Sequence, residues 1–434
     1  MKNIFLITTL FLASINLFAQ EILTVENAIL LAMEKNFDIR TMKNNLEITE
    51  NNKSIYNTGY LPSFSATGGA GYSLGNTLFV LQNNDEVEIN GAESTNYNGG
   101  VAINYVLFNG FARKERKEIL STLFEVANLQ KTGVIKNVVF RTYNTYYTIA
   151  RTVLRKEILE QAYDISKERL TRITYQYNYG QKTNLEVLNA KVDATNDSLA
   201  LENIKVQIAN AKRNLNFLTG EQIDKQFEVN KTVVVDESLV YEELLNKMLD
   251  NDENLAQLDL NKAITNSNLK INKSNYLPSL SSQAAYNLSN SQFEDNIFYQ
   301  SQNTNGLNLG LNLTWNIFDG GRTKTLVQNS KIDLLNMELS SEQLILNLTN
   351  QLSITWANYQ YQLGAIQSEQ LNVELSEQNF LKTQERYNLG QISSIDFRQA
   401  QLNFINAQMN LNQAKFDAKN SELELKLLSG EIVK

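Results

Sequence analysis

The sequence of 434 residues contains no cysteine and no histidine. Without cysteine, the chain has no disulfide, no thiol catalysis and no lipid-modified N-terminal cysteine. Without histidine, it lacks serine–histidine–aspartate catalysis, histidine-ligated zinc and most acid–base chemistry near neutral pH. We therefore expect a binding or conducting protein and no enzyme, with no cofactor and no metal.

Long hydrophobic runs are missing beyond the N-terminus. Residues 1–19 combine Lys2, an apolar run and a small final residue, Ala19, which predicts a secretory signal peptide. No later run reaches the roughly 18 apolar residues of a membrane-spanning helix. Without residues 1–19 the chain has 38 basic and 47 acidic residues, a net charge of −9. This acidic balance argues against nucleic acid as a partner.

Proline is scarce as well. The chain has two, Pro62 and Pro278, and both lie in the phrase Tyr-Leu-Pro-Ser. Because proline stops a helix from propagating, we interpret each as a crossing from helix to strand. Other phrases recur at an offset of about 210 residues, for example Phe-Asn-Gly at 108–110 and Phe-Asp-Gly at 318–320. The repeats predict a tandem duplication.

The expected elements follow the same order in both repeats. The first repeat, residues 20–220, is predicted to contain a helix over 24–58, a β-hairpin over 61–109, a long helix over 113–179 and a helix over 183–218. The second, residues 221–434, is predicted to contain a linker and a helix over 237–275, a β-hairpin over 278–318, a long helix over 322–389 and a helix over 393–428.

Strands are the elements that could enter a membrane. Residues 307–317 read LNLGLNLTWNI, with every second residue apolar and the others polar. This alternation is typical of a strand with one lipid-facing side, although a sheet covering a soluble core would show it too. Aromatic residues gather at one end of the expected strands, as in an interfacial girdle. They are Tyr105, Phe108, Trp315 and Phe318.

Four strands per chain cannot close a membrane barrel alone, because open edges cannot face lipid and the smallest barrels have about eight strands. Two copies would supply eight strands and three would supply twelve. Since the inward face is polar, the wider option would enclose water. The expected long helices would reach roughly 100 Å. Two apolar rows along residues 393–428 indicate a neighbouring helix on each side, as in a ring, although a closed bundle remains an alternative.

Taken together, the duplicated Tyr-Leu-Pro-Ser phrases, the Phe-Asn-Gly and Phe-Asp-Gly-Gly-Arg turns, and the paired Tyr-Asn-x-Gly-Gln turns resemble the TolC-like outer membrane efflux proteins of Gram-negative bacteria. The resemblance implies a mixed α and β membrane protein with an α-helical coiled-coil barrel and four strands per chain of a shared 12-stranded trimeric β-barrel. It also implies a homotrimer in the outer membrane lipid with a long periplasmic extension, which contacts a periplasmic adaptor and an inner-membrane pump. The expected function is a passive, gated exit duct for efflux. Alternatives are the duct of a type I polypeptide secretion system or, more remotely, a non-conducting periplasmic scaffold.

The resemblance also suggests roles for particular residues. Asp396, Glu186 and Tyr387 match acidic and tyrosine positions at the family's periplasmic gate, and Gln399 stands where the family has another acid. Ile392 replaces the gate arginine, so the gate must be held differently. Capping is the preferred interpretation for Glu186, and for Asp396 capping and a gate role both stay open, because each follows a Thr or Ser by three residues at a predicted helix start. The resemblance implies that the turn residues Gly180, Gln181, Gly390 and Gln391 contact the adaptor, although a role in the tight turn alone would also explain them.

Overall fold

The computed structural model describes residues 22–294 and 299–433. The predicted signal peptide, residues 1–19, lies outside this range. The chain divides into a helical unit, residues 22–41, 132–252 and 346–433, and a sheet unit, residues 42–131 and 253–345. Two long helices contribute residues to both units.

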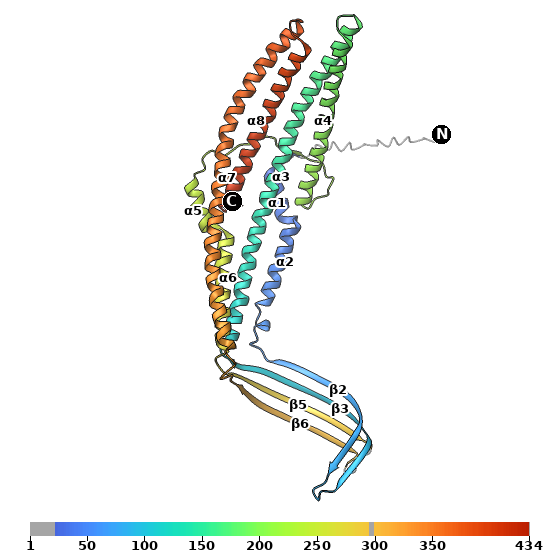
Figure 1. The fold of residues 1–434 in the computed structure, drawn as a ribbon, viewed down its shortest axis with the longest axis vertical. Coiled ribbons are helices and arrows are strands. Elements are labelled where there is room, and N and C mark those ends of the chain that lie inside the picture. The colour runs from blue at the N-terminus through green and yellow to red at the C-terminus, as the bar shows by residue number, and fades with distance from the viewer. Residues whose placement is uncertain (1–21, 295–298, 434) are drawn as a thin grey trace, which may run out of the picture. The chain divides into compact units, whose positions relative to one another are not determined.

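The sheet unit is built on four antiparallel strands, shown side by side in Figure 1. They are β2 (Ser63–Val80), β3 (Glu86–Asn109), β5 (Ser279–Phe293) and β6 (Ser301–Thr314), in the order β2-β3-β5-β6. The pairing of β3 with β5 joins the two repeats. β2 and β6 each keep one edge without a partner strand among the described residues.

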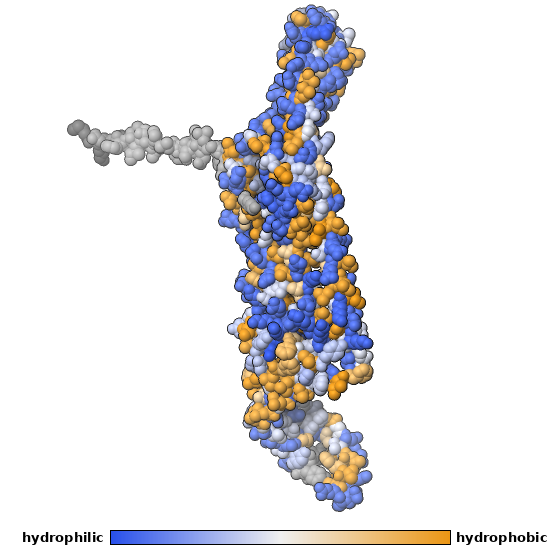
Figure 2. Space-filling view, turned by 90° about the vertical axis from the view of Figure 1, so that its left-hand side faces the viewer, coloured by the Kyte–Doolittle hydropathy of each residue, from blue (hydrophilic) through white to orange (hydrophobic). Residues whose placement is uncertain are grey.

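The predicted alternation on the last strand is confirmed, and its apolar side is bare. Leu307, Leu309, Leu311 and Leu313 are between 64% and 74% exposed in this chain. Hydrophobic side chains are visible over the strands in Figure 2. The apolar side therefore does not cover a core of the same chain, and the soluble-core alternative is wrong.

The strands end together at the prolines. Ser279 pairs with Asn109 on one side and with Thr314 on the other, so Phe108 and Trp315 lie at the same end of the sheet. β6 stops at Thr314, three residues before the expected end at Ile317. The residue opposite Trp315 would be Pro278, which has no N–H to extend the ladder. Instead, Trp315 Nε1 donates to the carbonyl oxygen of Tyr276 at 3.1 Å.

The long helices begin directly after the repeated Phe-Asn-Gly and Phe-Asp-Gly turns. α3 (Ala112–Asn178) and α7 (Arg322–Asn388) have 67 residues each. Asn109 Oδ1 accepts from the backbone N–H of Arg113 at 3.2 Å, and Asp319 Oδ2 accepts from that of Thr323 at 2.9 Å. These side chains satisfy N–H groups that a helix start leaves unpaired, which explains the recurrence of Asn or Asp at this position.

The helices predicted before the hairpins are each divided, so the expectation of single helices over 24–58 and 237–275 is wrong. The first is α1 (Val25–Lys35) and α2 (Phe37–Asn52), followed by the short 3₁₀ helix η1 (Ile55–Asn57), and the second is α5 (Tyr241–Asn251) and α6 (Glu253–Ser274). Asn36 causes the first break. Its Oδ1 accepts from the N–H of Asp38 at 2.9 Å, and its Nδ2 donates to Leu218 O at 2.9 Å.

The helical unit also contains α4 (Asn184–Leu218), α8 (Ser394–Leu428) and an unpredicted parallel pair of short strands, β1 (Ile22–Leu23) and β4 (Glu228–Val229). The two apolar rows of α8 contact different neighbours, as predicted. Phe416 and Leu423 pack with Tyr147 of α3, while Leu425 packs with Tyr359 of α7. α8 is therefore held from both sides.

No helix within residues 22–294 and 299–433 combines the length and the apolar character needed to cross a membrane.

Candidate gate at the helix tips

The turns from α3 to α4 and from α7 to α8, here called the tips, share one backbone geometry. Gly180 and Gly390 have φ angles of +73° and +74°. Gln181 N–H donates to Gln176 O at 2.8 Å, and Gln391 N–H donates to Arg386 O at 2.9 Å. This is the Schellman ending of a helix, in which a left-handed residue lets later N–H groups reach the last free carbonyls.

The helices after the turns start with capping boxes, as predicted. Thr183 Oγ1 accepts from the N–H of Glu186, whose carboxylate accepts from the N–H of Thr183 at 2.9 Å. Ser393 and Asp396 repeat the arrangement at the start of α8. The gate role of Glu186 and Asp396 stays a prediction.

The two carboxylates differ in their remaining contacts. Lys182 Nζ donates to Glu186 Oε1 at 2.8 Å. This hydrogen bond, followed by the one from Thr183 N–H, lowers the pKa of Glu186 below its usual value. Asp396 accepts from Ser393 Oγ at 2.7 Å and has no ion pair among the described residues. Asp396 is therefore the carboxylate with more capacity to attract a mobile cation.

Tyr387 lies inside an aromatic cluster. Its ring stacks on Phe397 of α8 at a centroid distance of 4.7 Å, and it is 8% exposed. The guanidinium of Arg172, from α3, lies over the same ring at 5.4 Å, and Arg172 Nη2 donates to Asn388 O at 3.0 Å. Ile392, which stands where the resemblance suggested an arginine, packs against this cluster. Tyr387 therefore helps to hold α7, α8 and α3 together.

A buried network of charged residues, which the sequence reasoning missed, lies beside the aromatic cluster. Arg398 of α8 donates from Nη1 and Nη2 to the two oxygens of Asp197 of α4, at 2.7 Å each. Ser166 of α3 also donates to Asp197, and Arg169 of α3 pairs with Asp193 of α4. Side chains of Arg398 and Asp197 are each 12% exposed. The four-residue spacing of Asp193 and Asp197 on α4 could have been noticed, but their partner Arg398 is about 200 positions away.

A cavity of about 400 Å³ brings some of the predicted residues together. Glu186 of α4 and Gln399 of α8 line it, along with Asp193 and Arg398. Gln399 is exposed and donates from Nε2 to Asn403 Oδ1 at 2.9 Å. Tyr387 and Asp396 do not line this cavity. The predicted gate residues therefore lie in separate places: Glu186 and Gln399 at this cavity, Tyr387 in the aromatic cluster and Asp396 in the cap of α8.

The geometry links one hairpin, α3–α4, to the other, α7–α8, through side chains. The links are the Arg398–Asp197 ion pair, the Arg172–Asn388 hydrogen bonds and the hydrogen bond from Arg169 Nη1 to Ser394 O at 3.4 Å. These contacts join the two hairpins near the tips.

Comparison with known proteins identifies the family of this chain. The sequence profile of the family described as outer membrane efflux protein matches residues 28–221 and 244–431, one match in each repeat. The chain belongs to this family. Outer membrane protein TolC of Vibrio cholerae serotype O1 is 19% identical over 316 residues, which cover 70% of both chains.

Solved structures show the same fold. The outer membrane channel CmeC of Campylobacter jejuni aligns with a TM-score of 0.76 at 17% identity, covering 94% of this chain and 85% of CmeC. The outer membrane protein VceC of Vibrio cholerae aligns with a TM-score of 0.72 at 15% identity, covering 94% and 96%. The fold is that of the trimeric outer membrane channels, in which strands and long helices of each chain enter shared barrels. The chain is an outer membrane protein with a long periplasmic helical extension.

Proposed function

We propose that this protein is the passive exit duct of a tripartite efflux system, and that it works as a homotrimer with a periplasmic adaptor and an inner-membrane pump. The open edges of β2 and β6 support the trimer, since unpaired strand edges in lipid would leave N–H and C=O groups unsatisfied. The bare leucines of β6 support contact with outer membrane lipid. Membership of the outer membrane efflux family supports export as the activity.

The duct closes at the tips and opens when the two hairpins separate. The observation that carries this step is the ion pair between Arg398 and Asp197, because it joins α8 to α4 in a largely buried place. Breaking a buried ion pair is costly unless another contact compensates, so the pair favours the closed arrangement. An adaptor that contacts Gly180, Gln181, Gly390 and Gln391 would supply the compensating contacts.

Current through planar bilayers tests the gate. Purified wild-type protein should insert with small, rarely open conductance, and the double variant Asp197→Asn with Arg398→Gln should open more often, because both charges leave together. Lys205→Gln is the matched control, since its pair with Glu202 on α4 is exposed. Unchanged opening in the double variant would remove the network from the gate. Absence of current from every variant would support the non-conducting scaffold instead.

Crosslinking tests the adaptor contact. Because the chain has no cysteine, Gln391→Cys creates a unique thiol at a tip. It should crosslink to the adaptor encoded beside this protein, while Glu50→Cys on α2 should not. Equal crosslinking at both positions, or none at the tip, would contradict docking at these turns. Recovery of an ATP-driven polypeptide secretion pump in the same complex would support the secretion alternative.

A further inference from the structure

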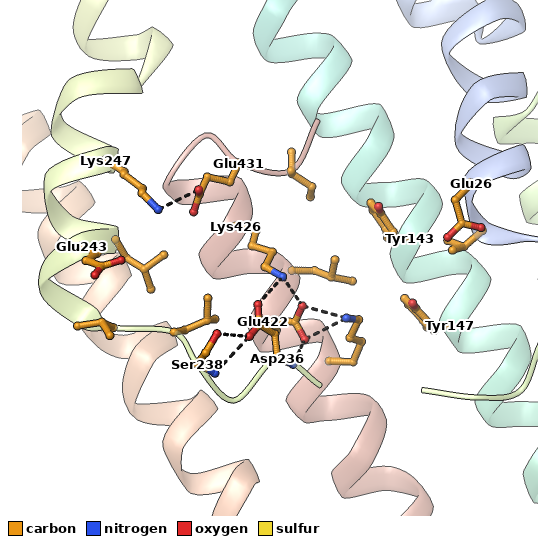
Figure 3. A pocket seen from close by; sticks show the side chains of 17 residues that line it. Glu26, Tyr143, Tyr147, Asp236, Ser238, Glu243, Lys247, Glu422, Lys426 and Glu431 are labelled. Carbon is orange, nitrogen blue, oxygen red and sulfur yellow. Dashed lines mark hydrogen bonds and ion pairs between the residues drawn. The ribbon is translucent and has the colours of Figure 1, made fainter. Parts of the chain in front are cut away.

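A cavity of about 530 Å³ lies in the helical unit, away from the tips (Figure 3). Its lining comes from α1, α3, α5, α8, the segment before α5 and the residues after α8. Cavities of this size commonly hold small organic molecules. The predicted gate residues do not line it, so the proposed gate does not explain its chemistry.

The positive charges of the lysines that line the cavity are already balanced by ion pairs with carboxylates. Glu422 is fully buried and accepts from Lys419 Nζ at 2.9 and 3.0 Å and from Lys426 Nζ at 2.7 Å. Lys426 also donates to Asp236 Oδ2 at 3.2 Å, and Lys247 donates to Glu431 Oε1 at 2.9 Å. Figure 3 shows these pairs as dashed lines. None of the three lysines is left free to attract an anion.

Two carboxylates of the lining have no hydrogen bond or ion pair among the described residues. Glu26 lies on α1 and Glu243 on α5, and Figure 3 places them at opposite sides of the cavity. With these two, five carboxylates and three lysines line the cavity, a net charge of −2. The uncompensated charge therefore favours a cationic occupant.

Two tyrosine hydroxyls from α3 also lie free beside the cavity. Tyr147 is 9% exposed, and its hydroxyl has no hydrogen-bond partner among residues 22–294 and 299–433. Burial, more than the nearby negative charges, raises its pKa to about 12. The hydroxyl of Tyr143 is also unpartnered, and burial followed by the charge of Glu26 raises its pKa. Both hydroxyls are therefore neutral, and each can accept a hydrogen bond.

We propose that this cavity binds a small organic ammonium ion, whose N–H groups donate to Glu26, Tyr143 and Tyr147 on one side and, in a diamine, to Glu243 on the other. Ammonium carries several N–H donors, and this lining offers free carboxylate and hydroxyl acceptors. A bare metal ion fits less well, because no cluster of three or more carboxylates in the described chain is placed to hold one.

Calorimetric titration of the purified mature protein in detergent tests the site, with putrescine as the probe. Putrescine should bind, and its uncharged analogue butanediol should not. Glu26→Gln and Tyr147→Phe should each weaken putrescine binding by about tenfold, the loss expected for a hydrogen bond to a charged group. Glu34→Gln, an exposed carboxylate elsewhere on α1, should leave binding unchanged. Size-exclusion chromatography checks that each variant remains assembled.

Three outcomes would overturn the proposal. Putrescine could fail to bind the wild-type protein, butanediol could bind as tightly as putrescine, or both Glu26→Gln and Tyr147→Phe could bind like wild type. None of these outcomes concerns ion conduction. Failure of the binding test would therefore leave the proposed gate unaffected, and failure of the gate test would leave the binding site unaffected.

Discussion

Arg398 on α8 and Asp197 on α4 form a two-pronged ion pair, in which each of two guanidinium nitrogens lies 2.7 Å from a carboxylate oxygen. The planar guanidinium matches the carboxylate geometry, which a lysine in the same place would not. Because α4 and α8 belong to different repeats, the pair ties the two halves of the duplication together.

A double-mutant cycle should show strong coupling between Arg398 and Asp197. Asp197→Ala or Arg398→Ala alone leaves a largely buried charge unpaired, which is expected to destabilise by about 3–5 kcal/mol. The double variant should lose clearly less stability than the sum of the losses in the two single variants. Denaturant unfolding followed by circular dichroism measures the effect, and the exposed Lys205–Glu202 pair is the control, with a coupling below about 1 kcal/mol. Additive losses at Arg398 and Asp197 would show that the pair is not coupled.

Asp396→Asn should separate capping from a role in cation block. Asparagine keeps an oxygen acceptor for Ser393, so the stability should change by less than about 1 kcal/mol. The predicted gate role would place three Asp396 carboxylates around the pore entrance of the proposed trimer, and their loss should then weaken block by divalent cations added from the periplasmic side. Glu186→Gln on α4 is the comparison, since Lys182 already pairs with that carboxylate. Block that persists unchanged in Asp396→Asn would leave capping as the only role of Asp396.

Asp236 should make part of the stability depend on acid pH. Hydrogen bonds from Ser238, with a further one from Lys426, lower the pKa of Asp236 from 3.8 to about 2. A depressed pKa means that the stabilisation is present above pH 3.8 and is lost as the pH falls towards 2. The difference in melting temperature between wild type and Asp236→Asn should therefore narrow over this window, while Glu34→Gln reports the general effect of removing one charge. A difference that stays constant with pH would contradict the assigned contacts.

The glycines of the repeated turns should differ in their tolerance of alanine. Gly110 and Gly320 have similar φ angles of +64° and +70°. A Cβ at Gly110 would lie 2.7 Å from Ser274 O, whereas a Cβ at Gly320 meets nothing within 4 Å. Gly320→Ala should lower the stability by about 1–2 kcal/mol, because alanine is strained in the left-handed backbone conformation. Gly110→Ala should lower it by about 1–3 kcal/mol more, because the added Cβ also clashes with Ser274 O. Melting temperatures of the two variants check this order, and equal losses would show that α6 moves aside.

Several local features of this protein follow from short stretches of sequence. Three such features were predictable, because each depends on residues within a few positions of one another. They are the glycines that end α3 and α7, Gly180 and Gly390, the capping boxes, and the alternation along β6. The two prolines likewise mark where β2 and β5 begin, at Ser63 and Ser279. In the first repeat, however, α2 already ends at Asn52, so Pro62 does not end that helix by itself.

Tertiary structure decided the features that depend on distant partners. Asn36 divides α1 from α2 while its amide also binds Leu218 O, about 180 positions away, and no local pattern contains that contact. The Arg398–Asp197 pair and the placement of Tyr387 between Phe397 and Arg172 have the same origin. The sequence by itself determined the duplication, the two long helices, the four strands of the sheet, the strand faces and the family. Only the tertiary structure decided which charges meet in the buried network and which stay free around the large cavity, because ion pairing depends on distance in space and a linear pattern fixes distance only within one helix or strand.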